Sequence, residues 1–268
     1  MDASALNALS ALVRVPLTAF GIGFARMFGL LLILPMSTRL GLRGLQRAGV
    51  AAALSCLIVP ALVPQLDAQA IDTARLVLLI AKEACMGFML GLLFAAPFWA
   101  AESAGEILDI QRGSRGALVP DPVSEEQGGI TATLLVLTTI AIFLASDGMH
   151  LLINAMLQSY RVWPALDLAP HFAPSAALQL LSLLDDVLRA GLLLAAPILG
   201  AMLLTELTLA LISRFAPQLN VFDLALSVKG LVFVIGLPLY AVFLIGYLRT
   251  GLAPLLDLDA AFHRLAGN

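Results

Sequence analysis

Hydrophobic residues along this chain gather in long stretches, and the segments between the stretches carry most of the charged side chains. A helix needs ~20 mostly apolar residues to cross the ~30 Å of hydrocarbon in a membrane. Six stretches reach or approach that length: Val15–Met36, Ala48–Leu66, Ala84–Ala101, Gln127–Ser146, Ala190–Thr205 and Gly230–Leu248. A helix satisfies its backbone hydrogen bonds within one segment, and the sequence lacks the alternation that is typical of membrane barrels. The pattern therefore predicts an all-α integral membrane protein with about six hydrophobic segments.

Prolines and charged residues interrupt these predicted spans. Four prolines fall in a stretch or at its edge: Pro60, Pro97, Pro197 and Pro238. Because proline removes a backbone donor, we expect the helices to be kinked there. Arg26 lies inside the first stretch, where a charge costs ~2.5–3.5 kcal/mol at the bilayer centre. For Arg26, Asp147 and Glu206 two interpretations are open: they face a partner subunit or an aqueous cavity, or they reach from a span end to the membrane surface.

Composition narrows the class of protein further. The chain is 60% hydrophobic and 12% charged, against ~45–50% and ~25% in soluble domains. So little polar surface argues against a soluble globular protein. The formal net charge of −3 gives no basic surface for nucleic acid. Lysine and arginine are shared equally between the two sides of a six-span topology, so the positive-inside rule gives no orientation.

The sequence contains no catalytic or metal-binding motif. Cys56 and Cys85 lie in apolar stretches and are no disulfide framework, and the three histidines are not at ligand spacing. Nucleophile-elbow, zinc-protease and phosphate-loop motifs are missing. We therefore expect no enzyme, no cofactor and no metal site.

The segment after the third stretch has an unusual polar pattern. Glu102, Glu106, Asp109 and Arg112 are spaced by four, three and three residues, so they share one face of a helix that continues out of the span. A charged stripe on an apolar helix requires water or counter-charges beside it.

A loop is predicted directly after this stripe. Gly113 and Gly116 break the helix, and Pro120 and Pro122 prevent it from resuming. Two interpretations are open from composition: a loop that lines or plugs an aqueous passage, or an ordinary solvated loop at the membrane surface.

Several segments in this order resemble the export-apparatus subunit of type III secretion systems, called SctT in injectisomes and FliR in flagella. The matching segments run along most of the chain: Arg26-Met-Phe-Gly29 with Pro35; Lys82-Glu83 with Gly87 and Gly91; Glu102 to Gly113 with Asp121-Pro122 and Gln127; Gly148-Met-His150 and Ser159 to Pro164; and Glu206 to Phe222 with Lys229. The stretches Gln111-Arg112-Gly113 and Ser159 to Pro164 resemble the injectisome branch more than the flagellar one.

The resemblance implies a non-enzymatic core subunit of the type III export gate in the bacterial inner membrane, which helps to form and close a pore for unfolded proteins. It implies kinked helical hairpins in a hetero-oligomeric helical assembly, in part raised above the bilayer plane within the basal body. The implied partners are the R and S subunits (flagellar P and Q), the U subunit (flagellar FlhB), the V subunit, inner-rod or needle components, secreted proteins in transit and membrane lipid, but no nucleic acid.

The resemblance also implies roles for residues. The loop that contributes to closing the pore corresponds to a stretch that contains Asp109, Gln111, Arg112, Gly113, Ser114, Arg115, Gly116, Asp121 and Pro122. Candidates for subunit interfaces and buried ion pairs are Arg26, Lys82, Glu83, Glu102, Glu106, Glu206, Asn220, Phe222 and Lys229. We expect residues 1–268 to form a single helical domain that ends in a short amphipathic tail over 249–268.

Two alternatives are a flagellar subunit of the same family and a stand-alone transporter or channel for small solutes. In a transporter, Arg26, Asp147 and Glu206 would be substrate or proton sites.

Overall fold

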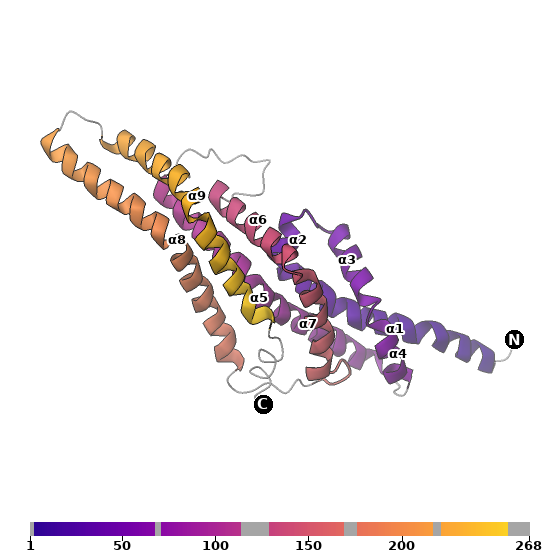
Figure 1. The fold of residues 1–268 in the computed structure, drawn as a ribbon. Coiled ribbons are helices and arrows are strands. Elements are labelled where there is room, and N and C mark those ends of the chain that lie inside the picture. Colours follow the sequence, from indigo (N-terminus) through magenta and orange to yellow (C-terminus); the bar gives the residue numbers. More distant parts are fainter. Residues whose placement is uncertain (1–2, 68–70, 114–128, 169–175, 217–220, 257–268) are drawn as a thin grey trace. The chain divides into compact units, whose positions relative to one another are not determined.

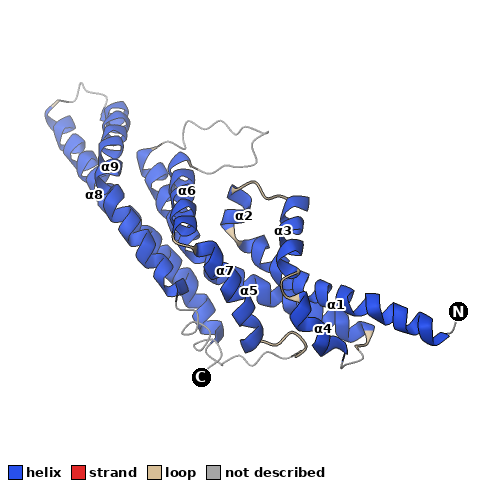
Figure 2. Cartoon of the chain, turned by 45° about the vertical axis from the view of Figure 1, so that its right-hand side comes forward, coloured by secondary structure: helices blue, strands red, loops and turns tan. Residues whose placement is uncertain are grey.

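A computed structural model describes residues 3–67, 71–113, 129–168, 176–216 and 221–256. Within these residues every regular element is a helix, which confirms the all-α fold (Figures 1 and 2). The helices are α1 (Ala3–Ile33), α2 (Pro35–Arg39), α3 (Leu45–Ser55), α4 (Val59–Asp67), α5 (Thr73–Arg112), α6 (Ile130–Ala145), α7 (Gly148–Val162), α8 (Ala176–Phe215) and α9 (Val221–Leu256).

The described helices make this a multi-pass membrane protein. Four segments are long and apolar enough to cross a membrane: Val13–Ile33, Thr73–Arg112, Leu181–Phe215 and Leu224–Tyr247. The pairs α3 with α4 and α6 with α7 bring the number to as many as six if each interrupted pair is one span. The prediction of about six hydrophobic segments is therefore confirmed.

One predicted span, Ala48–Leu66, is divided between two helices, whereas α6 lies as one helix within the predicted span Gln127–Ser146. The stretch Ala48–Leu66 is divided between α3 and α4, which meet at an angle of 65°. Pro60 is the second residue of α4, where proline is tolerated because the first N–H groups of a helix have no intrahelical partner. The stretch Gln127–Ser146 ends at Asp147, whose φ of 55° is incompatible with a continuing right-handed helix.

Two other helices are far longer than their hydrophobic stretches. Helices α5 and α8 each have 40 residues, although only Ala84–Ala101 and Ala190–Thr205 were predicted to span. A span predicted from hydropathy ends at the first charged residue. A helix, however, can continue through charged residues when their side chains have hydrogen-bond or ion-pair partners. Pro97 and Pro197 lie inside these helices.

Contacts divide the chain into two compact units. Unit 1 contains residues 1–95, 149–179 and 257–268, and unit 2 contains residues 96–148 and 180–256. The single domain remains a prediction. Helix α9 extends to Leu256 and so includes the start of the predicted tail, whose residues 257–268 lie outside the described residues.

In unit 1, α1 contacts α3 and α4 and approaches α5 very closely. A Cβ atom on Gly87 of α5 would overlap the carbonyl oxygen of Arg26, and one on Gly91 would lie 2.9 Å from the carbonyl oxygen of Leu30. The G-x-x-x-G spacing therefore lets the two backbones meet.

In unit 2, the second half of α5 packs on α6 and α8. A Cβ atom on Gly105 would overlap the backbone of Ala132 in α6, and one on Gly191 of α8 would lie 3.1 Å from the carbonyl oxygen of Ala100. The rings of Phe98 and Phe143 meet edge to face at 5.5 Å. Helices α8 and α9 run in opposite directions as a hairpin (Figure 1) and expose many large apolar side chains. Such surface is expected where lipid or another subunit covers a protein.

Candidate functional site

A buried ion pair joins α1 and α5 in unit 1. The guanidinium of Arg26 donates from Nε to Glu83 Oε2 at 2.6 Å and from Nη2 to Glu83 Oε1 at 2.8 Å. Both side chains are completely buried. This two-point geometry is the strong form of an arginine–carboxylate contact, so the charge predicted inside the first span is neutralised within the chain.

The remaining donors of Arg26 reach α7 and the segment after it. Nη1 donates to Ser159 Oγ at 2.8 Å, and Nη2 donates to the carbonyl oxygen of Trp163 at 3.0 Å. The guanidinium carbon lies 3.7 Å from the centre of the Tyr160 ring, a distance at which a cation is attracted to the ring face. Arg26 therefore connects α1 to both α5 and α7.

Two further cations hold the segment that follows α7. Lys82 Nζ lies 2.5 Å from Glu83 Oε1 and donates to the carbonyl oxygens of Pro164 and Ala165 at 2.9 and 3.0 Å. Arg75 donates to the carbonyl oxygen of Leu166 at 3.4 Å. Carbonyl groups at and beyond a helix C-terminus lack intrahelical partners and attract cations, so this set of contacts fixes the exit from α7.

The predicted interface residues Arg26, Lys82 and Glu83 thus come together inside one chain. A role for them between subunits remains a prediction. Sequence reasoning gave no role to Ser159, Tyr160 or Trp163, although they lie in a segment that it singled out. Spacing could not reveal these contacts, because more than 130 residues separate Arg26 from its partners on α7 and just after it.

The polar stripe on α5 forms a second site, in unit 2. Helix α5 continues through the stripe and ends at Arg112, and Gly113 follows with φ of 76°, so the predicted helix break at this glycine is confirmed. Asp109 is fully buried and receives a hydrogen bond from Arg112 Nη2 at 2.9 Å. Within the stripe, the cation Arg112 therefore pairs with Asp109.

Asp109 and Glu106 also cap α6. Asp109 accepts hydrogen bonds from the backbone N–H of Thr131 at 2.9 Å and from its hydroxyl at 2.6 Å. Glu106 accepts one from the N–H of Gly129 at 3.1 Å. Gly129 is the N-cap of α6 and has no side chain to do this. Carboxylates from α5 therefore satisfy the free N–H groups and the positive end of α6.

The last turn of α5 also contacts α8 and α9. Gln111 Nε2 donates to Glu206 Oε2 at 3.1 Å, and Lys229 Nζ of α9 lies 3.7 Å from Glu206 Oε1. The guanidinium carbon of Arg112 lies 4.5 Å from the centre of the Phe233 ring. Four of the predicted residues therefore meet at one place on three helices: Gln111, Arg112, Glu206 and Lys229.

Other predicted residues lie elsewhere. Glu102 is half-buried on α5. Phe222 belongs to α9, and its side chain is not described. Six predicted residues lie outside the described residues: Ser114, Arg115, Gly116, Asp121, Pro122 and Asn220.

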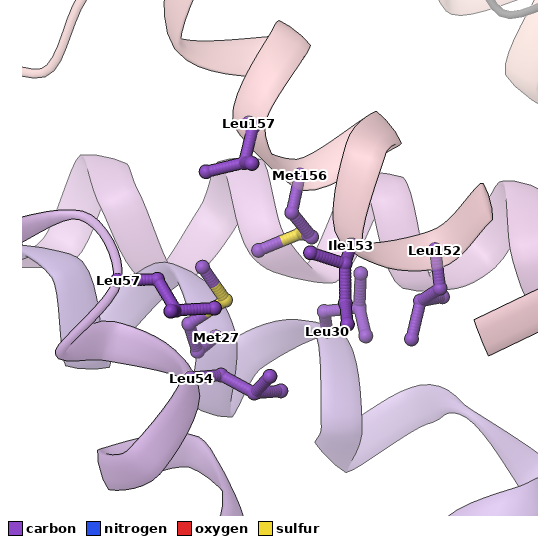
Figure 3. A pocket seen from close by; sticks show the side chains of 8 residues that line it. All are labelled: Met27, Leu30, Leu54, Leu57, Leu152, Ile153, Met156 and Leu157. Atoms are coloured by element: carbon purple, nitrogen blue, oxygen red, sulfur yellow. The ribbon is translucent and has the colours of Figure 1, made fainter. Parts of the chain in front are cut away.

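An apolar pocket opens in unit 1 (Figure 3). Side chains from α1, α3 and α7 line it, together with Leu57 beyond the end of α3. The lining residues are Met27, Leu30, Leu54, Leu57, Leu152, Ile153, Met156 and Leu157. All eight lining side chains are apolar, and two of them are methionines. Among the described residues, no group of three or more His, Cys, Asp or Glu side chains could hold a metal ion.

Comparison with known families gives the context for both sites. Residues 17–253 match the family described as bacterial export proteins, family 1. The chain belongs to this family. The matched range contains both the Arg26–Glu83 pair and the network at the end of α5.

Individual members of the export family extend the similarity over most of the chain. The chain is 34% identical to the Yop proteins translocation protein T of Yersinia pestis over 92% of this chain and 94% of that protein. It is 30% identical to the surface presentation of antigens protein SpaR of Salmonella typhimurium, over 82% and 81% of the two chains. It is 28% identical to the flagellar biosynthetic protein FliR of Pectobacterium carotovorum, over 74% and 75%.

Proposed function

We propose that this chain is a non-enzymatic core subunit of the type III protein secretion export gate, in the bacterial inner membrane. The observation that carries the proposal is the 34% identity to Yop proteins translocation protein T over 92% of the chain. Identity to the flagellar FliR protein is lower, at 28% over 74% of the chain, which favours the injectisome branch over the flagellar one.

In this proposal the protein acts with the R and S subunits, the U and V subunits and the inner-rod or needle components, and contacts secreted proteins in transit. The exposed apolar side chains of α8 and α9 offer the surface for other subunits and for lipid. Glu206 supports an interface, because half of its side chain is exposed (51%) within a helix that could span a membrane. A carboxylate in such a position favours a donor group or water beside it.

We further propose that the stretch from Asp109 to Pro122 contributes to closing the pore. Support comes from its two flanks, because Glu106 and Asp109 hold the end of α5 against the start of α6.

A stand-alone transporter is the weaker alternative. Arg26 would have to bind substrate or protons, yet it is fully buried and makes four hydrogen bonds with Glu83, Ser159 and Trp163. Four of the five N–H donors of Arg26 are therefore engaged within the chain.

The test is a chromosomal deletion complemented by this chain. We expect the deletion to abolish secretion of type III substrates and the tagged chain to co-purify with R and S subunits. Normal secretion without the protein would refute the proposal. A stable single-protein preparation that takes up a small solute would favour the transporter instead.

A further inference from the structure

One face of α9 lies against the last turn of α5. Leu226, Lys229 and Phe233 are spaced by three and four residues, which places them on the same side of the helix. Within unit 2, Phe233 lies beside Arg112, Lys229 lies beside Glu206, and Leu226 lies beside Gly113.

Phe233 provides an aromatic face to Arg112, whose guanidinium carbon lies 4.5 Å from the ring centre. The same guanidinium holds Asp109 at 2.9 Å, and Asp109 caps α6. Arg112 therefore has its position set by an anion on one side and by α9 on the other.

Lys229 acts through α8. Its side chain is almost fully buried, so it depends on the nearby carboxylate of Glu206 at 3.7 Å. Glu206 in turn accepts a hydrogen bond from Gln111, the residue before Arg112. A movement of Lys229 is therefore transmitted to the same turn of α5.

Leu226 lies beside Gly113, the glycine that follows the last residue of α5. A Cβ atom on Gly113 would be 2.5 Å from Leu226 Cδ2, and Gly113 has a φ of 76°. The positive φ favours glycine at this position, because residues with a side chain rarely adopt this backbone conformation.

We propose that the face of α9 formed by Leu226, Lys229 and Phe233 positions the last turn of α5, and thereby sets the balance between the closed and open pore. This rests on the proposed function. The three residues are positioning residues, since they act through Gln111, Arg112 and Gly113. A shift of α8 or α9, where other subunits bind in the proposed function, would reach the loop through this face.

The experiment uses the complete export apparatus in cells and measures two quantities for each variant. The first is the amount of complex that co-purifies with the R and S subunits. The second is potassium efflux per assembled complex. Since a cation–π contact shifts an equilibrium by roughly two- to fivefold, we expect Phe233→Leu to raise efflux by that factor while the complex still assembles. Phe233→Tyr keeps the ring and should behave as the unchanged protein.

Two comparisons separate positioning from general stability. Leu226→Ala should raise efflux, whereas Leu231→Ala, the same change on the opposite and exposed side of α9, should not. Phe233→Leu should add little to efflux in an Arg112→Gln background, because Arg112→Gln already removes the cation that the ring contacts. Lys229→Met gives an independent measurement through Glu206.

Unchanged efflux in assembled Phe233→Leu and Lys229→Met complexes would overturn the proposal. Three other outcomes would also overturn the proposal. They are equal effects of Leu226→Ala and Leu231→Ala, additive effects of the Arg112 and Phe233 changes, and loss of assembly in all α9 variants. A variant that lacks residues 113–116 distinguishes failure of the positioning role of α9 from failure of the proposed closing role of the loop. If the deletion leaks and the α9 variants do not, only the positioning role fails; if neither leaks, the closing role of the loop fails as well.

Discussion

The Arg26–Glu83 pair allows a prediction about which of its members matters more. Glu83 is the anion for two cations, since its Oε1 lies 2.8 Å from Arg26 Nη2 and 2.5 Å from Lys82 Nζ. Glu83→Gln therefore leaves both cations buried without their carboxylate, whereas Arg26→Met leaves Glu83 still paired with Lys82. We expect Glu83→Gln to be the more damaging change.

The magnitude follows from the burial of the pair. Both side chains are 0% exposed, and breaking a buried pair by removing one partner costs ~3–5 kcal/mol. The ratio of folded to unfolded protein should therefore fall by roughly two to four orders of magnitude. Replacing both members with apolar residues, as in Arg26→Met with Glu83→Leu, should recover part of this loss because no unpaired Arg26–Glu83 charge remains.

The assay is the amount of full-length protein in the membrane fraction, together with the thermal unfolding of the purified complex in detergent. Asp186→Asn is the matched control, because it removes an exposed carboxylate and should change stability by less than about 0.5 kcal/mol. The reasoning would be refuted if Glu83→Gln matched this control, or if Arg26→Met proved more damaging than Glu83→Gln.

Two further predictions concern helix packing. Asp109→Ala removes the carboxylate that caps α6 and should cost about 1–3 kcal/mol; hydrogen exchange at Thr131 should accelerate, and unchanged exchange would contradict the capping role. Gly87→Ala places a methyl group on the carbonyl oxygen of Arg26 and should lower the amount of protein in the membrane. Gly200→Ala meets nothing within 4 Å and should not, so equal behaviour of the two glycine variants would refute the close contact of α1 with α5.

Much of the fold could be predicted from the sequence because hydrophobic length is a local property. The four uninterrupted spans and the end of α5 at Gly113 follow from apolar stretches and from the conformational freedom of glycine. The helix ends were predicted less well. Helix α5 begins at Thr73, before Lys82 and Glu83. The hydropathy of a segment contains no information about whether the charges at its edge are paired.

In the candidate sites, too, some features follow from the sequence and others only from the tertiary structure. The sequence by itself marked Arg26, Asp109 and Glu206 as charges that an apolar chain must accommodate, because burying a charge is costly for every ionisable residue type. Glu83 was named only through the family resemblance. Only the tertiary structure decided that Glu83 is the partner of Arg26 and that Asp109 caps α6. The choice of partner depends on which side chains come within hydrogen-bonding distance when the helices pack, and residues 57 positions apart carry no local signal of that packing.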